Sequence, residues 1–337
     1  MKKRIIAAIA AALATLMLLG LATRLVMPKY IDNPEGALIA EYYSESGGHD
    51  LIFIGDCEVY ESFVPAYLFE NYGISSYIRG SAQQLVWQSY YLLEETFKYE
   101  APKAVVFNVM ALKYGEPQNE AYNRMTLDGM RWSSSKLGSI KASMTEDESS
   151  VEYLFPLLRF HSRITELEKE DFSYAFERPA VSHSGYLLQT GVVPRTDFSE
   201  GREQLDYTIS DNAWKYLDMM RDICVEKGVE LILVKAPTNS WQYYWHDEWE
   251  EQVAEYAENN SLAYYNFIPL CDEIGIDWNT DTYDAGAHLN VYGAEKLTDY
   301  FGKILTEKHS LEDKRQNSDM AALWQPRIES YHNAKKQ

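Results

Sequence analysis

Short apolar runs alternate with amphipathic stretches from residue 50 onward. The runs LIFIG (51–55), KAVVFNV (103–109) and VELILVKAP (229–237) are apolar almost throughout, as expected for strands buried on both faces of a sheet. Shorter candidate strands are SSYIRG (75–80) and LAYYNF (262–267), and the helical patterns are VWQSYYLLEETFKYE, DNAWKYLDMMRDICVEKG, WEEQVAEYAENN and GAEKLTDYFGKILTEK. This order predicts an α/β domain built on a doubly wound parallel sheet, whose ligand site lies at the carboxyl ends of the strands.

The stretch 114–205 interrupts this alternation. It contains a long amphipathic segment, KLGSIKASMTEDESSVEYLFPLLRFHSRITELEKE, followed by a segment that carries Ser, Gly and Pro. A structureless loop of this length is improbable inside a compact domain, so we expect an inserted helical subdomain that covers or lines the site. The domain as a whole is predicted to span 50–309, with a polar tail at 310–337 that is expected to be peripheral, although Trp324 suggests that some of it packs.

The N-terminus has the pattern of a membrane anchor. Three basic residues at 2–4 precede an apolar run at 5–22, which is about long enough to cross a bilayer at ~1.5 Å per residue. The basic end is expected in the cytoplasm and the rest of the chain outside. A cleaved signal peptide has the same order, but the run is long for one and no clear small-x-small cleavage site precedes Arg24. We therefore predict an uncleaved single-pass anchor at 1–26 and a juxtamembrane segment at 27–49.

Composition limits the classes of partner. A chain of 337 residues that is 46% hydrophobic can bury a sizeable core, and no linker-like stretch divides it. The formal net charge of −20 argues against nucleic-acid binding, which depends on clustered Lys and Arg. The simplest account of this acidity is solubility.

The cysteines are Cys57, Cys224 and Cys271. An odd number outside the cytoplasm leaves at least one thiol free or paired with another molecule. Cys224 lies in an apolar helical stretch and is expected to be a buried core residue, and Cys271 is open to the same interpretation. No Cys-x-x-Cys pair or His-rich cluster has metal-ligand spacing, so we expect neither a metal nor a cofactor.

A candidate nucleophile follows the first predicted strand. In LIFIGDCEVY the strand ends at Gly55, with Asp56 and Cys57 next. A nucleophile must stand on a sharp turn, exposed to substrate and close to backbone amides that can bind an oxyanion. A lone cysteine after a strand is more often buried packing, so this motif alone is weak.

A candidate base lies near the end of the domain. The segment DTYDAGAHLNVYGAEKL places Asp284 four residues before His288, with Asn290 at the start of a helical pattern. A base histidine needs a carboxylate to fix its tautomer and stabilise the imidazolium. The alternative is a loop leading into a helix, whose Asp and Asn cap backbone groups and whose His is solvated.

Taken together, the two segments resemble the SGNH/GDSL hydrolases, which have the nucleophile after the first strand and Asp and His just before the last helix. The resemblance covers most of 50–305, with YGISSYIRGSAQQ as a second conserved block. The closest likeness is to the membrane-anchored, wall-facing branch that includes the D-alanyl-lipoteichoic acid biosynthesis and alginate O-acetylation proteins. It implies a flavodoxin-like sheet and acyl-ester chemistry.

The resemblance also implies roles for individual residues. Cys57 occupies the position of the family's nucleophilic serine, with His288 as base and Asp284 as acid, although the Asp-to-His spacing is one residue longer than usual. The backbone amides of Cys57 and Gly80 are implied oxyanion donors. The third block's Gly-x-Asn-Asp is absent, which leaves Asn108 either as a side-chain oxyanion donor or as a residue that ties down a turn.

Several other residues are candidates for substrate contact. They are Asp56 beside the nucleophile, Gln83 (with Gln84) in the second block, Arg131 and His161 (with Arg163) in the insertion, Lys235 at a strand end, and Asn290. The alternatives for those in the insertion are helix caps and surface ion pairs. The aromatic run WQYYWHDEW (241–249) is either a sugar-stacking platform or ordinary packing.

These features predict a cell-surface acyl-ester enzyme that removes or transfers a small acyl group on a wall or secreted polysaccharide. A thiolate nucleophile would pass through a thioester, which favours transfer where water is excluded. The alternatives are a non-catalytic relative that binds glycan, and a scaffold subunit held near a multi-spanning acyltransferase by its anchor.

Overall fold

A five-stranded parallel sheet organises the chain. The computed structural model describes residues 1–28, 35–177, 179–195 and 201–337. The strands are β1 (Leu51–Gly55), β2 (Ser76–Gly80), β3 (Ala104–Asn108), β4 (Glu230–Lys235) and β5 (Ala263–Asn266). All neighbours pair in parallel, in the order β2-β1-β3-β4-β5. This flavodoxin-like order confirms the predicted α/β doubly wound sheet.

Helices cover both faces of the sheet. Phe53 of β1 and Val106 of β3 pack with α4 (Pro65–Tyr72) and α14 (Val291–Lys308) on one face. Ile52 of β1 and Val105 of β3 pack on the other face with α5 (Val86–Thr96), α11 (Asp211–Lys227) and α12 (Asp247–Asn259). Because successive side chains of a strand point to opposite faces, burial on both sides explains the uninterrupted apolar runs.

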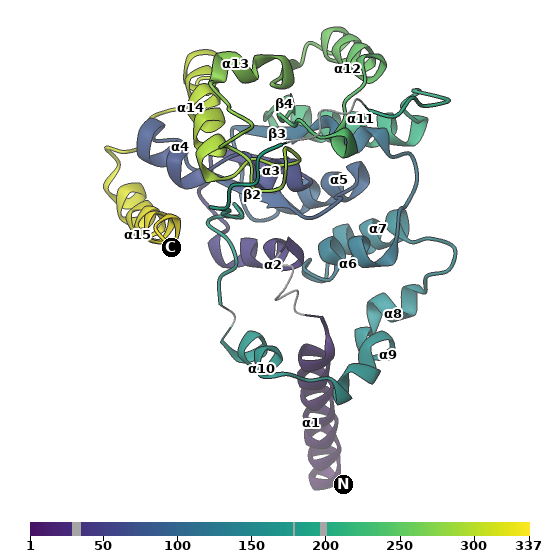
Figure 1. Cartoon of the computed structure of the whole chain (residues 1–337). Coiled ribbons are helices and arrows are strands. Elements are labelled where there is room, and N and C mark those ends of the chain that lie inside the picture. The colour runs from purple at the N-terminus through teal and green to yellow at the C-terminus, as the bar shows by residue number, and fades with distance from the viewer. Residues whose placement is uncertain (29–34, 178, 196–200) are drawn as a thin grey trace.

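The remaining elements complete the layers (Figure 1). They are α1 (Lys2–Val26), α2 (Glu35–Glu45), α3 (Cys57–Tyr60), η1 (Val109–Lys113), α6 (Glu120–Leu127), α7 (Ser134–Ser143), α8 (Ser150–Leu154), α9 (Pro156–Phe160), η2 (His161–Thr165), α10 (Lys169–Phe176), η3 (Trp241–Tyr243), η4 (Ile268–Leu270), α13 (Cys271–Ile274) and α15 (Ser318–Lys335).

The C-terminal tail packs more closely than expected. Its helix α15 lies against α4, and Trp324 is fully buried and stacked on Phe69 with ring centroids 4.9 Å apart. The tail is therefore continuous with the domain core and is not peripheral.

The insertion holds α6 to α10, which pack mainly on other helices. Helices α6 and α7 pack against α2 and α5, whereas α9, η2 and α10 pack against α1 (Figure 1). Thr126 of α6 also hydrogen-bonds to Ser81, which follows the carboxyl end of β2. The non-helical end of the insertion, residues 181–195, bonds to the segments that carry Cys57 and His288. The helices of the insertion pack against α1, α2 and α5.

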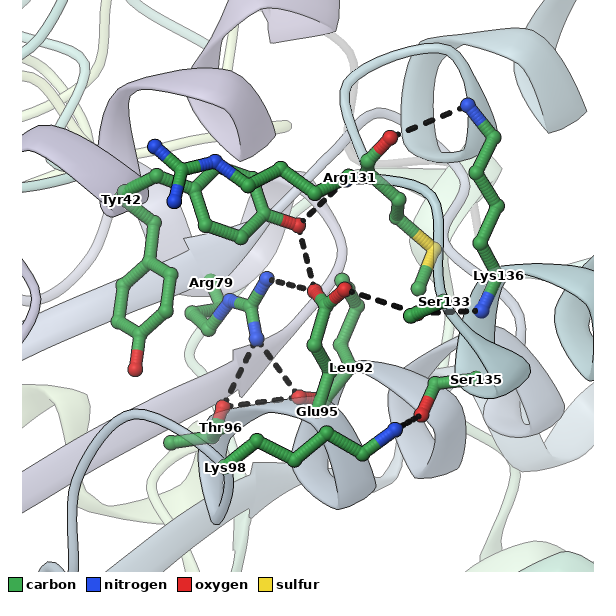
Figure 2. A network of polar contacts seen from close by, with 12 residues as sticks. Tyr42, Arg79, Leu92, Glu95, Thr96, Lys98, Arg131, Ser133, Ser135 and Lys136 are labelled. Carbon is green, nitrogen blue, oxygen red and sulfur yellow. Dashed lines mark hydrogen bonds and ion pairs between the residues drawn. The ribbon is translucent and has the colours of Figure 1, made fainter.

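A buried ion pair joins β2 of the sheet to α5, and its carboxylate also contacts α2 and the insertion (Figure 2). Arg79 of β2 and Glu95 of α5 are both fully buried, with Nη2 and Oε2 2.9 Å apart. Glu95 also accepts hydrogen bonds from Tyr43 of α2 at 2.5 Å and from Ser133 of the insertion at 3.3 Å. The guanidinium lies over the ring of Tyr42 at 4.0 Å. One carboxylate therefore joins β2, α5, α2 and the insertion.

Replacing Glu95 with Gln tests this role. The variant leaves the Arg79 charge buried without its counter-charge, so we expect a loss of about 3–5 kcal/mol in the free energy of unfolding. Denaturant unfolding of the purified protein measures it. As a control, Glu226→Gln removes an exposed carboxylate that pairs with its neighbour Lys227, and it should cost less than about 0.5 kcal/mol. Equal losses in the two variants would contradict the assignment.

Candidate active site

Cys57 lies on the turn that follows β1. Gly55 ends the strand, and a β-carbon there would lie 2.5 Å from Cγ2 of Val59, so only glycine fits. Asp56 caps α3 by accepting the backbone N–H of Glu58 at 3.2 Å, and Cys57 begins that helix. The thiol is therefore held at the carboxyl edge of the sheet, although Cys57 is only 6% exposed.

His288 lies on the loop before α14, paired with Asp284. One oxygen of Asp284 accepts from the His288 backbone N–H at 2.8 Å, and the other lies 2.6 Å from Nδ1. Between them, Ala285 (φ 63°) and Gly286 (φ 96°) adopt left-handed conformations. Two such residues turn the backbone tightly. The longer spacing seen in the sequence is thus compatible with an Asp–His pair.

The thiol and the imidazole both lie against Tyr243: the thiol donates to its hydroxyl, and the imidazole ring lies 5.0 Å from its ring. Burial raises the pKa of the Cys57 thiol above its ordinary value, and the charge of the nearby His288 lowers that pKa by less. The Nδ1 atom of His288 faces carboxylates, whereas Nε2 has no hydrogen-bond partner among the described residues. Nε2 is therefore the ring nitrogen that is not engaged by a carboxylate.

Glu61 is a second carboxylate at the imidazole that sequence reasoning missed. Its Oε2 lies 3.3 Å from Nδ1 of His288, and its Oε1 accepts a hydrogen bond from Tyr283 at 2.7 Å. Burial lowers the pKa of His288, but the opposite charges of the Cys57 thiolate and Glu61, with the hydrogen bond to Asp284, hold that pKa well above its usual value. The signal in the sequence is the four-residue spacing from Cys57 to Glu61, one turn of helix.

A buried polar layer lies beneath the turn. Lys235 pairs with Glu58 at 2.8 Å, and both side chains are buried. Asn108 donates its two amide hydrogens to Asp56 at 3.2 Å and to Glu58 at 2.9 Å. Burial, followed by the charge of Glu58, raises the pKa of Asp56 to about 6.

This layer corrects three expectations. Asn108 has no amide hydrogen left to donate to an oxyanion, because its carboxylate partners take both. Asp56 and Lys235 are buried with internal partners, so neither is placed to contact substrate. The three side chains support the nucleophile turn from below.

Three other candidates lie elsewhere. Asn290 is fully buried, where it caps the first turn of α14 and donates to Gly191 and Thr280. Arg131 lies over the ring of Tyr43 at 4.4 Å (Figure 2). His161 is exposed in η2, which packs on α1. The predicted substrate contact is therefore wrong for the buried Asn290, whereas for Arg131 and His161 it stays a prediction.

The segment YGISSYIRGSAQQ (72–84) lies beside the turn that carries Cys57. Gly80 pairs in register with Gly55, and a β-carbon on Gly80 would lie 3.1 Å from the carbonyl oxygen of Gly55. Gln83 follows at the same edge in a left-handed conformation (φ 49°). The side-chain amide of Gln84 bonds internally to Arg79. The backbone of Gly80 thus lies where an oxyanion donor is expected, whereas Gln84 is structural.

The non-helical end of the insertion connects the two halves of the site. The backbone N–H of Leu187 donates to the carbonyl of Tyr60 in α3 at 2.8 Å. Val193 donates to Thr282 and accepts from Ala285, both at 3.0 Å, in the loop that carries His288. These bonds fix the distance between the nucleophile turn and the histidine loop.

The aromatic run 241–249 divides into two roles. The thiol of Cys57 donates to the hydroxyl of Tyr243 at 3.8 Å, and the Tyr243 ring lies 5.0 Å from that of His288. Trp245 is buried and donates to Glu250 at 2.8 Å. Tyr243 therefore covers the thiol, while Trp245 packs.

The other thiols lie outside the site. Cys224 is buried in α11, as predicted, and Cys271 is half-buried at the start of α13. Within the described ranges, no group of three or more His, Cys, Asp or Glu side chains is arranged to hold a metal ion.

The sequence matches no protein-family model, and no curated protein matches it. Among solved structures, a Bacteroides fragilis "putative acylhydrolase" is similar with a TM-score of 0.38 and 11% identity, over 80% of this chain and 94% of that chain. The site is therefore assigned from the geometry of this chain.

The role of Glu61 is testable by titration. In Glu61→Gln the imidazolium loses one of its counter-charges, so we expect the pKa of His288 to fall and the ring to lose its proton at a lower pH than in the wild type. NMR titration of isotope-labelled histidine measures both midpoints. Glu70→Gln, which removes the partner of the exposed His332, is the matched control and should leave the His288 midpoint in place. An unchanged midpoint in Glu61→Gln would refute the contact.

Proposed function

We propose that this chain is an extracytoplasmic acyl-ester hydrolase or acyltransferase that acts through Cys57, His288 and Asp284. The observation that supports the proposal is that a strand-end thiol and an imidazole lie together against Tyr243, with Nδ1 of the imidazole facing the carboxylates of Asp284 and Glu61. This arrangement meets the geometric demands of covalent catalysis: a nucleophile, an adjacent base and a group that orients the base.

The reaction begins with transfer of the thiol proton to Nε2 of His288. The sulfur then attacks the ester carbonyl carbon, and the backbone N–H groups of Cys57 and Gly80 bind the oxyanion that develops. Collapse of the tetrahedral intermediate breaks the bond to the leaving oxygen, which takes the proton from His288. Cys57 is left as a thioester. Water or an acceptor hydroxyl then attacks the thioester carbonyl carbon and gives its proton to His288. The carbon–sulfur bond breaks, the acid or the new ester leaves, and His288 returns the proton to the Cys57 sulfur.

The proposed substrate is an acylated polysaccharide of the cell wall or a secreted polysaccharide. Two features support this location and substrate class: α1 is long and apolar enough to cross a membrane, and the motifs resemble those of wall-facing SGNH hydrolases. A multi-spanning acyltransferase in the same membrane is the proposed partner. Transfer is favoured over hydrolysis because the thiol is nearly covered.

A second candidate function is a non-catalytic SGNH-like subunit that binds glycan or acts as a scaffold. The observations that favour it are the cover of Tyr243 over the thiol, the raised pKa of Cys57, and the use of both Asn108 amide hydrogens inside the fold. Such a protein would have the same sheet and histidine loop but would not catalyse a reaction.

Cys57→Ala separates the two functions. With an activated acetyl ester as substrate, we expect the variant to lose release of the alcohol by on the order of 10³-fold or more, because the nucleophile is gone. Mass spectrometry of the quenched wild type should find the acetyl group on Cys57. Cys271→Ala, which removes the half-buried thiol of α13, should retain the wild-type rate. Equal rates in Cys57→Ala and the wild type would favour the non-catalytic subunit.

A further inference from the structure

Large apolar side chains are exposed together on one part of the insertion. Residues 150–176, which form α8, α9, η2 and α10, are named the collar here. Its large exposed apolar residues are Val151, Leu154, Phe155, Leu158, Ile164, Phe172 and Phe176, with Phe155 62% and Ile164 and Phe176 64% exposed. Single exposed apolar residues are ordinary, but a cluster of this kind marks an interaction surface.

The collar surrounds the end of α1 that adjoins the domain. Helix α9, η2 and α10 pack against α1, and Figure 1 shows α9 and α10 on opposite sides of it. A groove between α1 and the collar is lined by Leu19 and Thr23 of α1, by Phe155 and by Leu158 of α9. Its remaining wall, from the segment between α6 and α7, includes Asp128, Arg131 and Lys136. Arg163 donates from Nη1 to the carbonyl oxygen of Val26 at 2.8 Å, which ties η2 to the end of α1.

The length of α1 determines the depth in a bilayer at which the collar would lie. A bilayer core takes about 20 helical residues, and α1 has 25. If the core begins at the basic residues 2–4, it ends within the last two turns of α1, where Leu19 and Thr23 meet the collar. Arg24, just beyond the apolar run, is placed for the polar headgroup region. The exposed apolar residues are thus at the level where acyl chains give way to headgroups.

We propose that the collar is a membrane-interface element, whose apolar side chains insert among lipid acyl chains around the end of α1. Short helices with exposed Phe, Leu and Ile suit this region, since their apolar side chains leave water while polar groups remain at the headgroups. Lipid is favoured over a protein partner because the collar is continuous with α1, whose apolar side chains are themselves exposed. With the collar and α1 both engaged, the domain has a fixed orientation to the membrane.

Site-specific photo-crosslinking of the full chain in lipid nanodiscs tests the proposal. p-Benzoylphenylalanine replaces Phe155 or Phe176, a change between exposed aromatic residues that spares the core. Val225 on α11, 73% exposed, is the domain control, and Leu13 in α1 is the lipid control. After illumination, mass spectrometry identifies the molecule joined to each position.

The proposal predicts lipid adducts at Phe155 and Phe176 at a yield similar to Leu13 and at least about tenfold above Val225. Lipid adducts at Leu13 with only the Val225 level at the collar would overturn it, and so would adducts between the collar and a second polypeptide. No lipid adduct at Leu13 would mean that α1 does not cross the bilayer, and the proposal would fail with it. None of these outcomes depends on catalysis by Cys57.

Discussion

The placement of the Cys57 thiol and the His288 imidazole beside Tyr243, at one edge of the sheet, is the constraint on which the proposed chemistry depends. The thiol reaches the carboxyl edge of the sheet because β1 ends in a turn that only glycine can make. The imidazole reaches the same edge from the loop before α14, where Asp284 and Glu61 both face its Nδ1 atom. In a buried site, two carboxylates stabilise an imidazolium far more than they would in water. Proton transfer from sulfur to nitrogen therefore leaves each new charge with an opposite charge beside it.

Much of the sheet and part of the site could be predicted from the sequence. Continuous apolar runs identified the strands, and because parallel strands end at one edge, Cys57 and His288 were expected to lie close together. Side-chain partners could not be predicted, because they depend on packing across elements distant in sequence. The position of Asn108 at a strand end makes it a reasonable oxyanion donor in the sequence, but in the structure its amide donates to two buried carboxylates. Glu61 gave no signal beyond its helical spacing from Cys57, and Lys235, although at a strand end, lies below the site rather than in it.

The insertion shows a similar limit. Its helices could be predicted from amphipathic patterning, but the pattern does not say which surface an apolar face will meet. In the structure, the helices of the insertion pack against α1, α2 and α5. The short irregular segment 181–195 forms backbone hydrogen bonds both to the nucleophile turn and to the histidine loop. The site is consequently enclosed by loops: Tyr243 covers the thiol, and burial keeps the pKa of Cys57 high.

The pH dependence of Cys57 alkylation in the wild type and in His288→Asn tests the thiol–imidazole interaction most directly. Cys271, whose pKa burial raises to about 11, is an internal reference in the same samples. The account predicts that loss of the imidazole moves the midpoint for Cys57 to higher pH and slows its alkylation at neutral pH, while the Cys271 profile stays in place. Coincident Cys57 profiles in the two proteins would contradict it, because they would mean that the thiol ionises without any influence from His288.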